Sequence, residues 1–571
     1  GFDDEEAQLP ALLAAFRKNE GLVALGDGTF GVLPEEWLRS FGFLAGFGTE
    51  HGDHLRFGRR QVGVLDALLA AQPEASFDEV FARAREEFRR FSGIESRDPT
   101  PGFAGVLRSY QRDGLGWLDF LRRFGFGGIL ADDMGLGKTV QVLAFLEERR
   151  EGSANGVGGA RTVPALVVVP RSLVFNWRRE AERFAPKLRV VEHLGSGRNR
   201  GGNGFDDCDI VLTTYGTLRR DIAHLKDVRF EWVILDEAQA IKNATTATAK
   251  AARLLSADHR LALSGTPIEN HLGELWSLFE FLNPGMLGAA SAFRSARTGA
   301  RDLEESERTL LAHAVRPFVL RRRKEQVARD LPARHEQTIY AELDRAERKA
   351  YDELRDHYRR SLLSRVERDG LGKAKIHVLE ALLRLRQAAC HPGLIDRSRR
   401  VEPSAKLEIL LAQLGQVLDE GHKAVVFSQF VSFLTIARSR LDRERITYAY
   451  LDGKTRDREA RVARFQTDPE CRLFLVSLKA GGLGLNLTAA EYVYLLDPWW
   501  NPAVEAQAID RTHRIGQTRQ VFAYRLIARD TVEEKVLELQ RSKRALADAI
   551  IGEDNALVRD LTREDLERLL S

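Results

Sequence analysis

Short apolar runs alternate with helical patterns over residues 103–280, which predicts a parallel α/β sheet. Four of these runs have the length and composition of buried strands: residues 166–169, 210–213, 232–235 and 261–263. Each run ends at polar residues or a glycine-bearing turn. In a doubly wound sheet, ligands bind outside the carboxyl ends of the strands, so candidate site residues should follow these runs.

The same alternation returns from residue 402, with strands predicted at residues 424–427, 472–476 and 492–496. Apolar positions at helical spacing predict two helices between the α/β regions, at residues 344–364 and 375–389, and Cys390-His391-Pro392 ends the second. A charged amphipathic helix is predicted at residues 531–546, and one more at residues 560–570. The fold class is therefore α/β, with two parallel-sheet lobes, helical insertions and C-terminal helices.

Residues 1–100 form a small α/β appendage that shows no catalytic constellation. Residues 22–25 and 29–33 flank Gly26-Asp27-Gly28 and predict a β-hairpin. Helical patterns occupy residues 34–40 and 77–91. Residues 98–102, with two prolines, indicate a linker. We interpret the appendage as a packing or docking module.

Composition adds few constraints. The chain has 571 residues, enough for several domains, and a net charge of +3 with 30% charged residues, so a nucleic-acid surface must be a local patch. The three cysteines are far apart and form neither a metal spacing nor a disulfide framework. No apolar run approaches the ~18–20 residues of a membrane span, and no signal peptide is visible. The chain begins at Gly1 rather than Met, which indicates a fragment or a trimmed chain.

Residues 132–139 read Asp-Asp-Met-Gly-Leu-Gly-Lys-Thr, between an apolar run and a helical pattern at residues 140–148. A strand, a glycine-rich turn and a helix start make a phosphate-binding loop, because backbone N–H groups and the helix N-terminus face an anion. Lys138 can reach the β/γ-phosphates, and Thr139 can place its hydroxyl on Mg²⁺. The usual pattern opens with glycine where Asp132 stands, so a plain glycine-rich turn is the alternative for this motif alone.

Asp236 and Glu237 follow the predicted strand at residues 232–235. One carboxylate can hold the Mg²⁺ shell, and the next can orient and deprotonate a water for in-line attack on the γ-phosphate. For an isolated pair, capping of the following helix would be the favoured interpretation. Downstream of a phosphate loop and at the end of a buried strand, the catalytic interpretation is favoured.

Further blocks carry a family resemblance. They are residues 261–270 (Leu-Ala-Leu-Ser-Gly-Thr-Pro-Ile-Glu-Asn), 425–430 (Val-Val-Phe-Ser-Gln-Phe), 451–455 (Leu-Asp-Gly-Lys-Thr), 477–488 (Ser-Leu-Lys-Ala-Gly-Gly-Leu-Gly-Leu-Asn-Leu-Thr), and 497–517 with Asp-Pro-Trp-Trp-Asn-Pro and Asp-Arg-Thr-His-Arg-Ile-Gly-Gln. With residues 132–139 and 236–239, this series resembles the Swi/Snf-like ATPases, the chromatin-remodeller branch of the superfamily-two helicase-type motors. The departures are mild: Asp133 stands where the family commonly has Glu, and Gln239 where it often has His.

The resemblance implies two RecA-like lobes with ATP between them and duplex DNA across both. The implied domains are residues 1–100 (appendage), 101–272 (first lobe), 273–336 (helical protrusion and linker of the first lobe), 337–400 (helical protrusion of the second lobe), 401–530 (second lobe) and 531–571 (bracing C-terminal helices). The implied activity is a DNA-dependent ATPase that translocates on duplex DNA without strand separation and remodels DNA or protein–DNA complexes. A strand-separating DNA or RNA helicase and a binding scaffold without ATP hydrolysis are the alternatives.

Site residues also follow from the resemblance. The implied catalytic residues are Glu237, Asp236, Lys138, Arg514 and Arg511. The implied ATP-binding residues are Gln111, Asp133, Met134, Gly135, Leu136, Gly137, Lys138, Thr139 and Gln507, with Thr139 and Asp236 holding Mg²⁺ through ATP. Arg514 is the expected arginine finger, worth roughly 10³–10⁵ in rate; two surface arginines on a helix are the alternative. Gln111 matches the family's adenine-sensing glutamine, and the alternative is a plain glutamine on a helix surface.

The nucleic-acid contacts expected from the resemblance are Arg171, Ser172, Thr214, Thr217, Ser428, Gln429, Gly453, Lys479, Gly481, Gly482, Trp500 and Asn501, with turn chemistry as the alternative for each. Backbone contacts of this kind predict little sequence preference and strong salt dependence. The basic run at residues 321–324 is either a solvated face or a duplex-phosphate or regulatory contact. We expect a monomeric, cytoplasmic, nucleoid-associated prokaryotic motor whose remodelling target is DNA or a DNA-bound protein.

Overall fold

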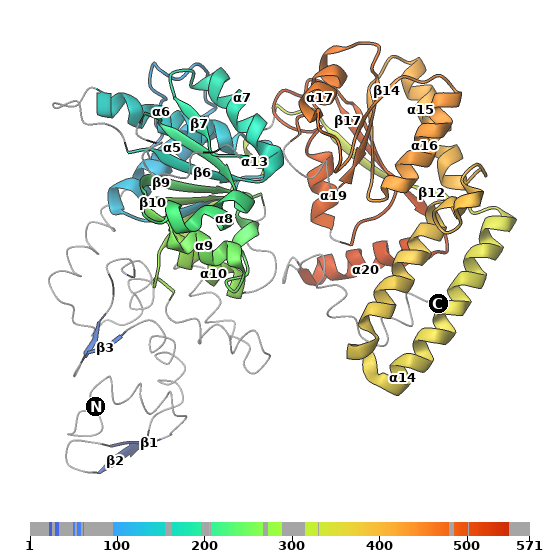
Figure 1. Ribbon diagram of the computed structural model, residues 1–571, viewed down its shortest axis with the longest axis horizontal. Coiled ribbons are helices and arrows are strands. Elements are labelled where there is room, and N and C mark those ends of the chain that lie inside the picture. Colours follow the sequence, from blue (N-terminus) through green and yellow to red (C-terminus); the bar gives the residue numbers. More distant parts are fainter. Residues whose placement is uncertain are drawn as a thin grey trace. The chain divides into compact units, whose positions relative to one another are not determined.

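The computed structural model describes residues 22–24, 29–32, 49–51, 54–56, 58, 61, 95–154, 163–195, 198, 205, 207–265, 272–287, 315–328, 330–478, 485–500 and 502–547. The chain divides into two compact units (Figure 1). The first comprises Gly1–Asp133 and Lys138–Arg323, and the second comprises Met134–Gly137 and Lys324–Ser571. Each unit is built around one large parallel sheet.

The sheet of the first unit has seven strands in the order β11-β5-β10-β9-β6-β8-β7, and every neighbouring pair is parallel. The strands are β5 (Gly128–Leu130), β6 (Ala165–Val169), β7 (Val190–Glu192), β8 (Ile210–Thr214), β9 (Arg229–Asp236), β10 (Ser256–Leu263) and β11 (Val319–Leu320). The four predicted strands of this region are confirmed. Central strands β6 and β8 are buried along their whole length, which explains their continuous apolar runs.

The helices of the first unit are α5 (Ser109–Phe124), α6 (Lys138–Ala154), α7 (Val174–Phe184), α8 (Tyr215–Leu225), α9 (Ala247–Leu254) and α10 (Leu272–Leu282). Short 3-10 helices span Arg171–Leu173, Ala238–Ile241 and Arg316–Phe318. Their apolar residues form one buried core with the strands. Helix α5 ends at Gly125, whose φ of 69° a residue with a side chain rarely adopts.

The sheet of the second unit has six parallel strands in the order β12-β17-β16-β13-β15-β14. The strands are β12 (Arg334–Ala341), β13 (Ala424–Ser428), β14 (Tyr448–Leu451), β15 (Leu473–Ser477), β16 (Tyr492–Leu495) and β17 (Val521–Ala528). Strands β13, β15 and β16 confirm the three predictions. The other three carry tyrosines, charges or partly exposed positions rather than a continuous apolar run, so the sequence pattern missed them.

The helices of the second unit are α13 (Lys324–Val327), α14 (Arg345–Cys390), α15 (Ala405–Asp419), α16 (Val431–Arg443), α17 (Arg458–Thr467), α19 (Pro502–Ile509) and α20 (Val532–Ala547). Helix α20 confirms the helix predicted at residues 531–546. Its expected role in bracing one lobe on the other stays a prediction. None of the helices in the described part of the chain has both the length and the apolar composition to cross a membrane.

Helix α14 differs from the prediction of two separate helices. It is one continuous run of 46 residues that folds back on itself (Figure 1). A straight helix of this length would hold its ends about 70 Å apart. Instead, Glu347 near its start accepts a hydrogen bond from the backbone N–H of Ala405 at 3.2 Å, and Cys390 at its end lies 3.8 Å from Lys406 Nζ. The two predicted segments are therefore the two arms of one bent helix.

Four short strands are described in the N-terminal region. Strands β1 (Leu22–Ala24) and β2 (Phe30–Val32) pair antiparallel and confirm the predicted hairpin. A second antiparallel pair, β3 (Thr49–His51) and β4 (His54–Arg56), was not predicted. The helices expected at residues 34–40, 77–91 and 560–570 lie outside the described residues. The predicted domain boundaries stay predictions, although β11 and the start of β12 lie in the stretch expected as protrusion and linker.

A buried ion pair ties three elements of the second unit. The Lys406 ammonium on α15 contacts the Glu533 carboxylate on α20, and both side chains are fully buried. Lys406 also donates to the carbonyl of Leu496 at 2.8 Å, and Glu533 accepts from the N–H of Ala528 at 3.0 Å. A buried charge that loses its partner costs far more than a broken surface pair.

We predict that Lys406→Met lowers the free energy of unfolding by about 3–5 kcal/mol, because Glu533 is left buried without its counter-ion. The control is Arg440→Met, which breaks the partly exposed pair with Glu408 (2.8 Å) and should cost under about 1 kcal/mol. Denaturant unfolding of the two variants measures both values. Equal losses would show that the buried pair has no special role.

Candidate active site

The glycine-rich loop between β5 and α6 has the backbone of an anion site. Gly135 and Gly137 have φ angles of 87° and 80°, in the left-handed region that residues with a Cβ rarely enter. Turns of this kind direct successive N–H groups toward one concave side, and α6 begins at Lys138. The loop therefore combines converging N–H groups with a helix N-terminus.

Lys138 is held over the first part of this loop. Its Nζ donates to the carbonyl of Asp132 at 2.6 Å and reaches that of Asp133 at 3.5 Å. Burial lowers the pKa of the Lys138 ammonium, and the carboxylates of Glu237, Asp132 and Asp236 oppose that shift. A desolvated cation bonded to neutral carbonyls is suited to a phosphate oxygen.

Asp132 is the residue that departs from the usual loop pattern, and its side chain is completely buried. Arg322 donates to both of its oxygens, at 2.8 Å through Nε, and Gln141 donates at 3.1 Å. A buried carboxylate with these partners is a structural anchor. Asp132 thus fixes the start of the loop, and the mismatch with the usual pattern has a structural reason.

Asp236 lies beside this loop because of the register of the sheet. Leu263 of β10 pairs with Asp236 on one side and with Leu130, the last residue of β5, on the other. Strands are spaced about 4.8 Å apart, so Asp236 and Leu130 are about 10 Å apart at the same edge. The two motifs that the sequence singled out are therefore neighbours in space.

The carboxylate of Asp236 is held by neighbours that the sequence analysis missed. Trp177 Nε1 on α7 donates to Oδ2 at 2.8 Å, and the N–H of Glu237 donates to Oδ1 at 2.9 Å. The Tyr215 hydroxyl donates to the Asp236 carbonyl at 2.8 Å. Burial, with repulsion from Glu237 as the second cause, raises the pKa of Asp236 to about 7, and the bond from Trp177 opposes the shift.

Glu237 has a left-handed backbone with φ 50° and ψ 56°, which costs a residue with a Cβ roughly 1–2 kcal/mol. It starts a short 3-10 helix, but its side chain makes no capping hydrogen bond. Instead Gln239 Nε2 donates to Glu237 Oε2 at 2.7 Å, and the Ser264 hydroxyl reaches Gln239 Oε1 at 3.4 Å. Gln239, the second departure from the family pattern, thus links Glu237 to the end of β10.

These groups fit a magnesium-nucleotide. The Thr139 hydroxyl and the Asp236 carboxylate are oxygen donors, and Mg²⁺ typically takes one or two carboxylates together with waters and substrate phosphates. Within the described residues, no group of three or more His, Cys, Asp or Glu could hold a metal ion by itself. The donor set therefore fits a metal ion that arrives with phosphate groups.

The remaining predicted ATP residues fall in both units. Gln111 is buried on α5, and its Oε1 accepts from the N–H of Arg108 at 2.9 Å, so it is no helix-surface residue. Gln507 lies on α19 in the second unit. Arg511 and Arg514 follow α19 in a turn, with Arg511 only 3% exposed. The alternative of two surface arginines is therefore wrong for Arg511.

Lys324 holds this arginine-bearing turn. Its Nζ donates to Asp510 Oδ1 and to the carbonyl of His513, both at 2.7 Å. The side chain of Lys324 is 10% exposed. Arg322, two residues earlier, is equally buried against Asp132. The basic run at residues 321–324 is therefore neither a plain solvated face nor, at Arg322 and Lys324, a free phosphate contact.

The predicted nucleic-acid residues are in different settings. Thr214 and Thr217 are buried and their hydroxyls bond each other at 3.0 Å, and Thr214 is the N-cap of α8. Ser428 is buried too and donates to Asp497 Oδ1 at 2.5 Å, while the N–H of Gln429 donates to the same carboxylate at 3.2 Å. The hydroxyls of Thr214, Thr217 and Ser428 bond to neighbouring protein groups, as the alternative of turn chemistry expected. Contacts from the backbone of these segments to nucleic acid stay a prediction.

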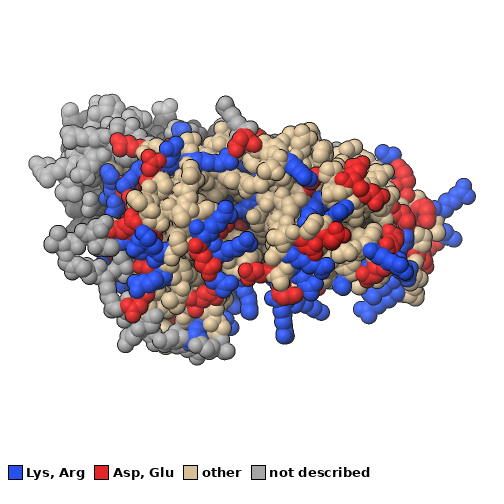
Figure 2. Space-filling model, turned by 90° about the horizontal axis from the view of Figure 1, so that it is seen from above, with Lys and Arg blue, Asp and Glu red and all other residues tan. Residues whose placement is uncertain are grey.

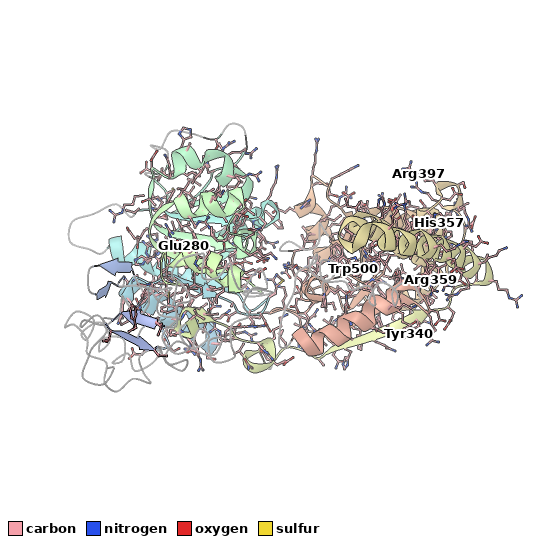
Figure 3. All side chains as sticks on the ribbon, turned by 90° about the horizontal axis from the view of Figure 1, so that it is seen from below. Glu280, Tyr340, His357, Arg359, Arg397 and Trp500 are labelled. Carbon is pink, nitrogen blue, oxygen red and sulfur yellow. The ribbon has the colours of Figure 1, made fainter. Side chains whose placement is uncertain are left out.

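Other members of that set are exposed, packed against a neighbouring side chain or outside the described residues. Arg171 is exposed after β6. Trp500 (Figure 3) has the guanidinium carbon of Arg386 5.4 Å from the centroid of its ring. Four residues, and the side chain of one more, lie outside the described part: Lys479, Gly481, Gly482 and Asn501, and the side chain of Ser172.

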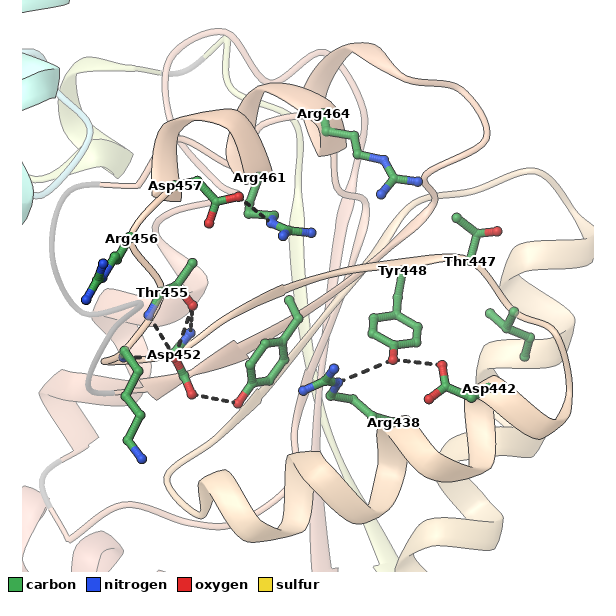
Figure 4. Close-up of a pocket in the computed structure, with 13 residues that line it drawn as sticks. Arg438, Asp442, Thr447, Tyr448, Asp452, Thr455, Arg456, Asp457, Arg461 and Arg464 are labelled. Atoms are coloured by element: carbon green, nitrogen blue, oxygen red, sulfur yellow. Dashed lines mark hydrogen bonds and ion pairs between the residues drawn. The ribbon is translucent and has the colours of Figure 1, made fainter.

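The chain neighbours of Gly453, Asp452 and Lys454, line a basic hollow of about 680 Å³ in the second unit (Figure 4). Its lining includes Arg438, Asp442, Ile446, Thr447, Tyr448, Tyr450, Asp452, Lys454, Thr455, Arg456, Asp457, Arg461 and Arg464. Asp452 accepts from the N–H groups of Lys454 (2.9 Å) and Thr455 (3.0 Å) and so fixes the turn around Gly453. On the face drawn in Figure 2, Lys and Arg are interspersed with Asp and Glu. Because the net charge of the chain is nearly neutral, a surface that binds a polyanion must be a local basic cluster, and the lining of this hollow is such a cluster.

Sequence reasoning missed the residues that position the site: Trp177, Tyr215, Arg322 and Lys324. Trp177 is a core residue and Tyr215 packs partly buried against the core, and only the hydrogen bonds of their polar atoms reveal the role. Arg322 and Lys324 were visible only as a basic run. Their partners are remote in sequence, so no spacing could have identified them.

Comparisons with known proteins match both large regions of the chain to family models. The family model of the SNF2-related domain matches residues 110–394, and that of the helicase conserved C-terminal domain matches residues 405–516. YwqA of Bacillus subtilis, named as a candidate ATP-dependent helicase/translocase, is 38% identical over 490 residues, or 83% of this chain and 51% of YwqA. An uncharacterized ATP-dependent helicase of Mycoplasma pneumoniae is 37% identical over 81% of this chain and 44% of its own length.

The yeast TATA-binding protein-associated factor MOT1 (Saccharomyces cerevisiae) is 33% identical over 79% of this chain and 28% of MOT1. The chain thus spans about half of the length, or less, of these curated relatives. Among solved structures, the Sulfolobus solfataricus SWI2/SNF2 ATPase core in complex with dsDNA is 35% identical, with 84% of this chain and 99% of that chain covered and a TM-score of 0.41. From the two family models and these sequence relatives, the chain belongs to the SNF2-related ATPase family, with a helicase conserved C-terminal domain after the SNF2-related domain.

Proposed function

We propose that this protein is a motor that hydrolyses ATP when bound to duplex DNA and translocates along it without separating the strands. The proposal rests on one observation: the phosphate loop and the Asp236–Glu237 pair follow the carboxyl ends of the neighbouring strands β5 and β9, which both pair with β10. The bacterial relatives, whose names give ATP-dependent helicase or translocase activity, support a prokaryotic motor. Its target in this proposal is nucleoid DNA or a protein bound to it.

The phosphate loop and residues of the first unit divide the work of ATP binding and hydrolysis. The loop N–H groups and Lys138 bind and orient the phosphates. Thr139 and Asp236 would hold Mg²⁺, which when bound would neutralise charge on the phosphate oxygens. Glu237 orients the attacking water and accepts its proton, and Gln239 sets the direction of the Glu237 carboxylate through the 2.7 Å bond.

The second unit supplies positive charge for the transferring phosphoryl group. Arg514 acts as the finger, with Arg511 and Gln507 in support, because a planar guanidinium neutralises charge that develops in the transition state. Nucleotide hydrolysis then depends on both units. Alternating grip of the two units on the DNA backbone converts the ATP cycle into movement.

Duplex DNA as the substrate is suggested by the Sulfolobus core, a relative at 35% identity that was solved with dsDNA. The names of the curated relatives use both helicase and translocase, so strand separation is the competing activity. Backbone contacts would make binding insensitive to base sequence and sensitive to salt.

We predict that duplex DNA stimulates the steady-state ATPase rate more than single-stranded DNA or duplex RNA does. The apparent DNA affinity should fall at least about tenfold between about 50 mM and about 200 mM salt, because phosphate contacts release counterions. ATPase titrations with each nucleic acid at the two salt concentrations measure this. Triplex displacement without unwinding of a tailed duplex supports translocation, whereas robust unwinding establishes the helicase alternative.

We predict that Lys138→Ala and Glu237→Gln each lower DNA-stimulated kcat/KM by about 100-fold or more, through loss of phosphate charge compensation and of the base, respectively. Glu237→Gln should retain nucleotide binding. Lys187→Ala and Glu182→Gln, at exposed positions of the same unit, serve as controls and should match the wild type. Normal turnover in either site variant would overturn the assignment.

We predict that kcat/KM falls on the acid side of its pH profile near pH 7. The pKa of Asp236 is raised to about 7, so its carboxylate takes up a proton as the pH falls through 7 and can no longer act as a metal ligand. In Trp177→Phe this limb should move to higher pH, since the lost N–H stabilised the ionised carboxylate. Trp232→Phe is the matched control: Trp232 is fully buried, and its Nε1 has no hydrogen-bond partner among the described residues. An unshifted limb in Trp177→Phe would remove Trp177 from the site.

A further inference from the structure

The chain passes from one unit to the other on either side of Met134–Gly137 and again inside the basic run, between Arg323 and Lys324. The residues on either side of Arg323 are both buried in ion pairs, one in each unit. Arg322 belongs to the first unit with its partner Asp132, and Lys324 belongs to the second unit with its partner Asp510. Their neighbour Arg321 is exposed. A solvated basic run would not show this pattern.

Arg322 ties three elements of the first unit to the phosphate loop. Its guanidinium donates to Asp132, to the Gln141 amide oxygen of α6 at 2.8 Å and to the Tyr110 carbonyl of α5. It also lies 5.0 Å from the centroid of the Tyr110 ring. Gly114 allows this approach, since a Cβ there would collide with Gln141 Oε1 and press on Arg322.

The main chain of the same segment is also bonded to the loop. The N–H of Ala131 donates to the carbonyl of Leu320 at 2.7 Å, and the N–H of Asp133 donates to that of Arg322 at 3.0 Å. Strand β11 is thus continued beyond β5 along the start of the loop. Both the side chain and the backbone of Arg322 therefore fix where the phosphate loop begins.

Lys324 fixes the arginine-bearing turn in a comparable way. Its two acceptors, Asp510 and the His513 carbonyl, flank Arg511 and directly precede Arg514. Arg334 also contacts Asp510, at 3.1 Å, but its side chain is more exposed, at 31%. Of these two cations, Lys324 is the buried one, and it holds both ends of the turn.

We propose that residues 322–324 are a positioning element of the motor. Arg322 holds the start of the phosphate loop in place, and Lys324 holds in place the turn that carries Arg511 and Arg514. This inference rests on the proposed function. The two anchors are joined by two residue steps, which span at most about 7 Å. So short a segment absorbs little displacement, and movement of one anchor is passed to the other.

The two anchors should have different kinetic signatures. The phosphate loop binds ATP in the ground state and in the transition state alike, so loss of its anchor weakens ATP binding and raises KM. The arginines act on charge that develops in the transition state, so loss of their anchor lowers kcat with little change in KM. A general loss of folded protein would instead lower the rate without changing KM or the rate per folded molecule.

The test uses Arg322→Lys, which keeps the buried charge but not the fork, and Lys324→Met. Arg321→Met and Arg334→Met are the matched controls, the first for charge in the basic run and the second for a cation on Asp510. We expect Arg322→Lys to raise KM for ATP about fivefold or more, and Lys324→Met to lower kcat about tenfold or more. Both controls should stay within about twofold of the wild type. Rates are normalised to the folded fraction from thermal unfolding, and Lys324→Arg should restore part of kcat.

The inference is overturned if the two variants match their controls, or if both change only in proportion to the folded fraction. It is separable from the proposed function because Glu237→Gln and the wild type are measured in parallel. If the wild type hydrolyses ATP and Lys324→Met has the same kinetics as Arg334→Met, the inference is wrong while the proposed function still stands. A wild type without turnover on duplex DNA removes the proposed function, and the positioning role falls with it.

Discussion

The register of β10 is the constraint on which the candidate site depends. One residue, Leu263, pairs with the end of β5 on one side and with the end of β9 on the other. The parallel ladder therefore brings the phosphate loop and the Asp236–Glu237 pair to the same edge, although they are remote in sequence. A slip of one residue in either pairing would turn every side chain of that strand to the opposite face of the sheet. The chemistry of the site is in this sense a consequence of main-chain hydrogen bonding.

Buried charge is the second recurring feature. Asp132 with Arg322 in the first unit, and Lys406 with Glu533 in the second, remove charged groups from water and pair each one with a fixed partner. Such pairs add little net stability compared with apolar packing, but breaking them is expensive. Their value is positional, because a desolvated charge tolerates few arrangements. The phosphate loop and the end of the second sheet are both held by contacts of this kind.

A strained backbone and a perturbed ionisation occur side by side at the proposed catalytic pair. Glu237 has a left-handed backbone, and Asp236 has a raised pKa because it is buried beside another carboxylate. Neither feature favours folding, and both are found where a motor would need a base and a metal ligand. Trp177 donates a hydrogen bond to the Asp236 carboxylate, and Gln239 donates one to the Glu237 carboxylate. Each carboxylate is thus oriented by its own partner.

The sequence by itself determined the fold class, the buried strands and the residues that carry chemistry, because apolar periodicity and the loop and acidic motifs are local signals. It did not reveal β12 or β17, whose mixed polar pattern reflects an edge strand and its neighbour. Nor did it show that α14 is one bent helix, since a reversal depends on what the two arms pack against. Arg322 and Lys324 illustrate the general limit. Their side chains are two among many basic residues until the tertiary structure buries each beside one distant carboxylate, and burial is a property of the assembled sheets, not of the chain.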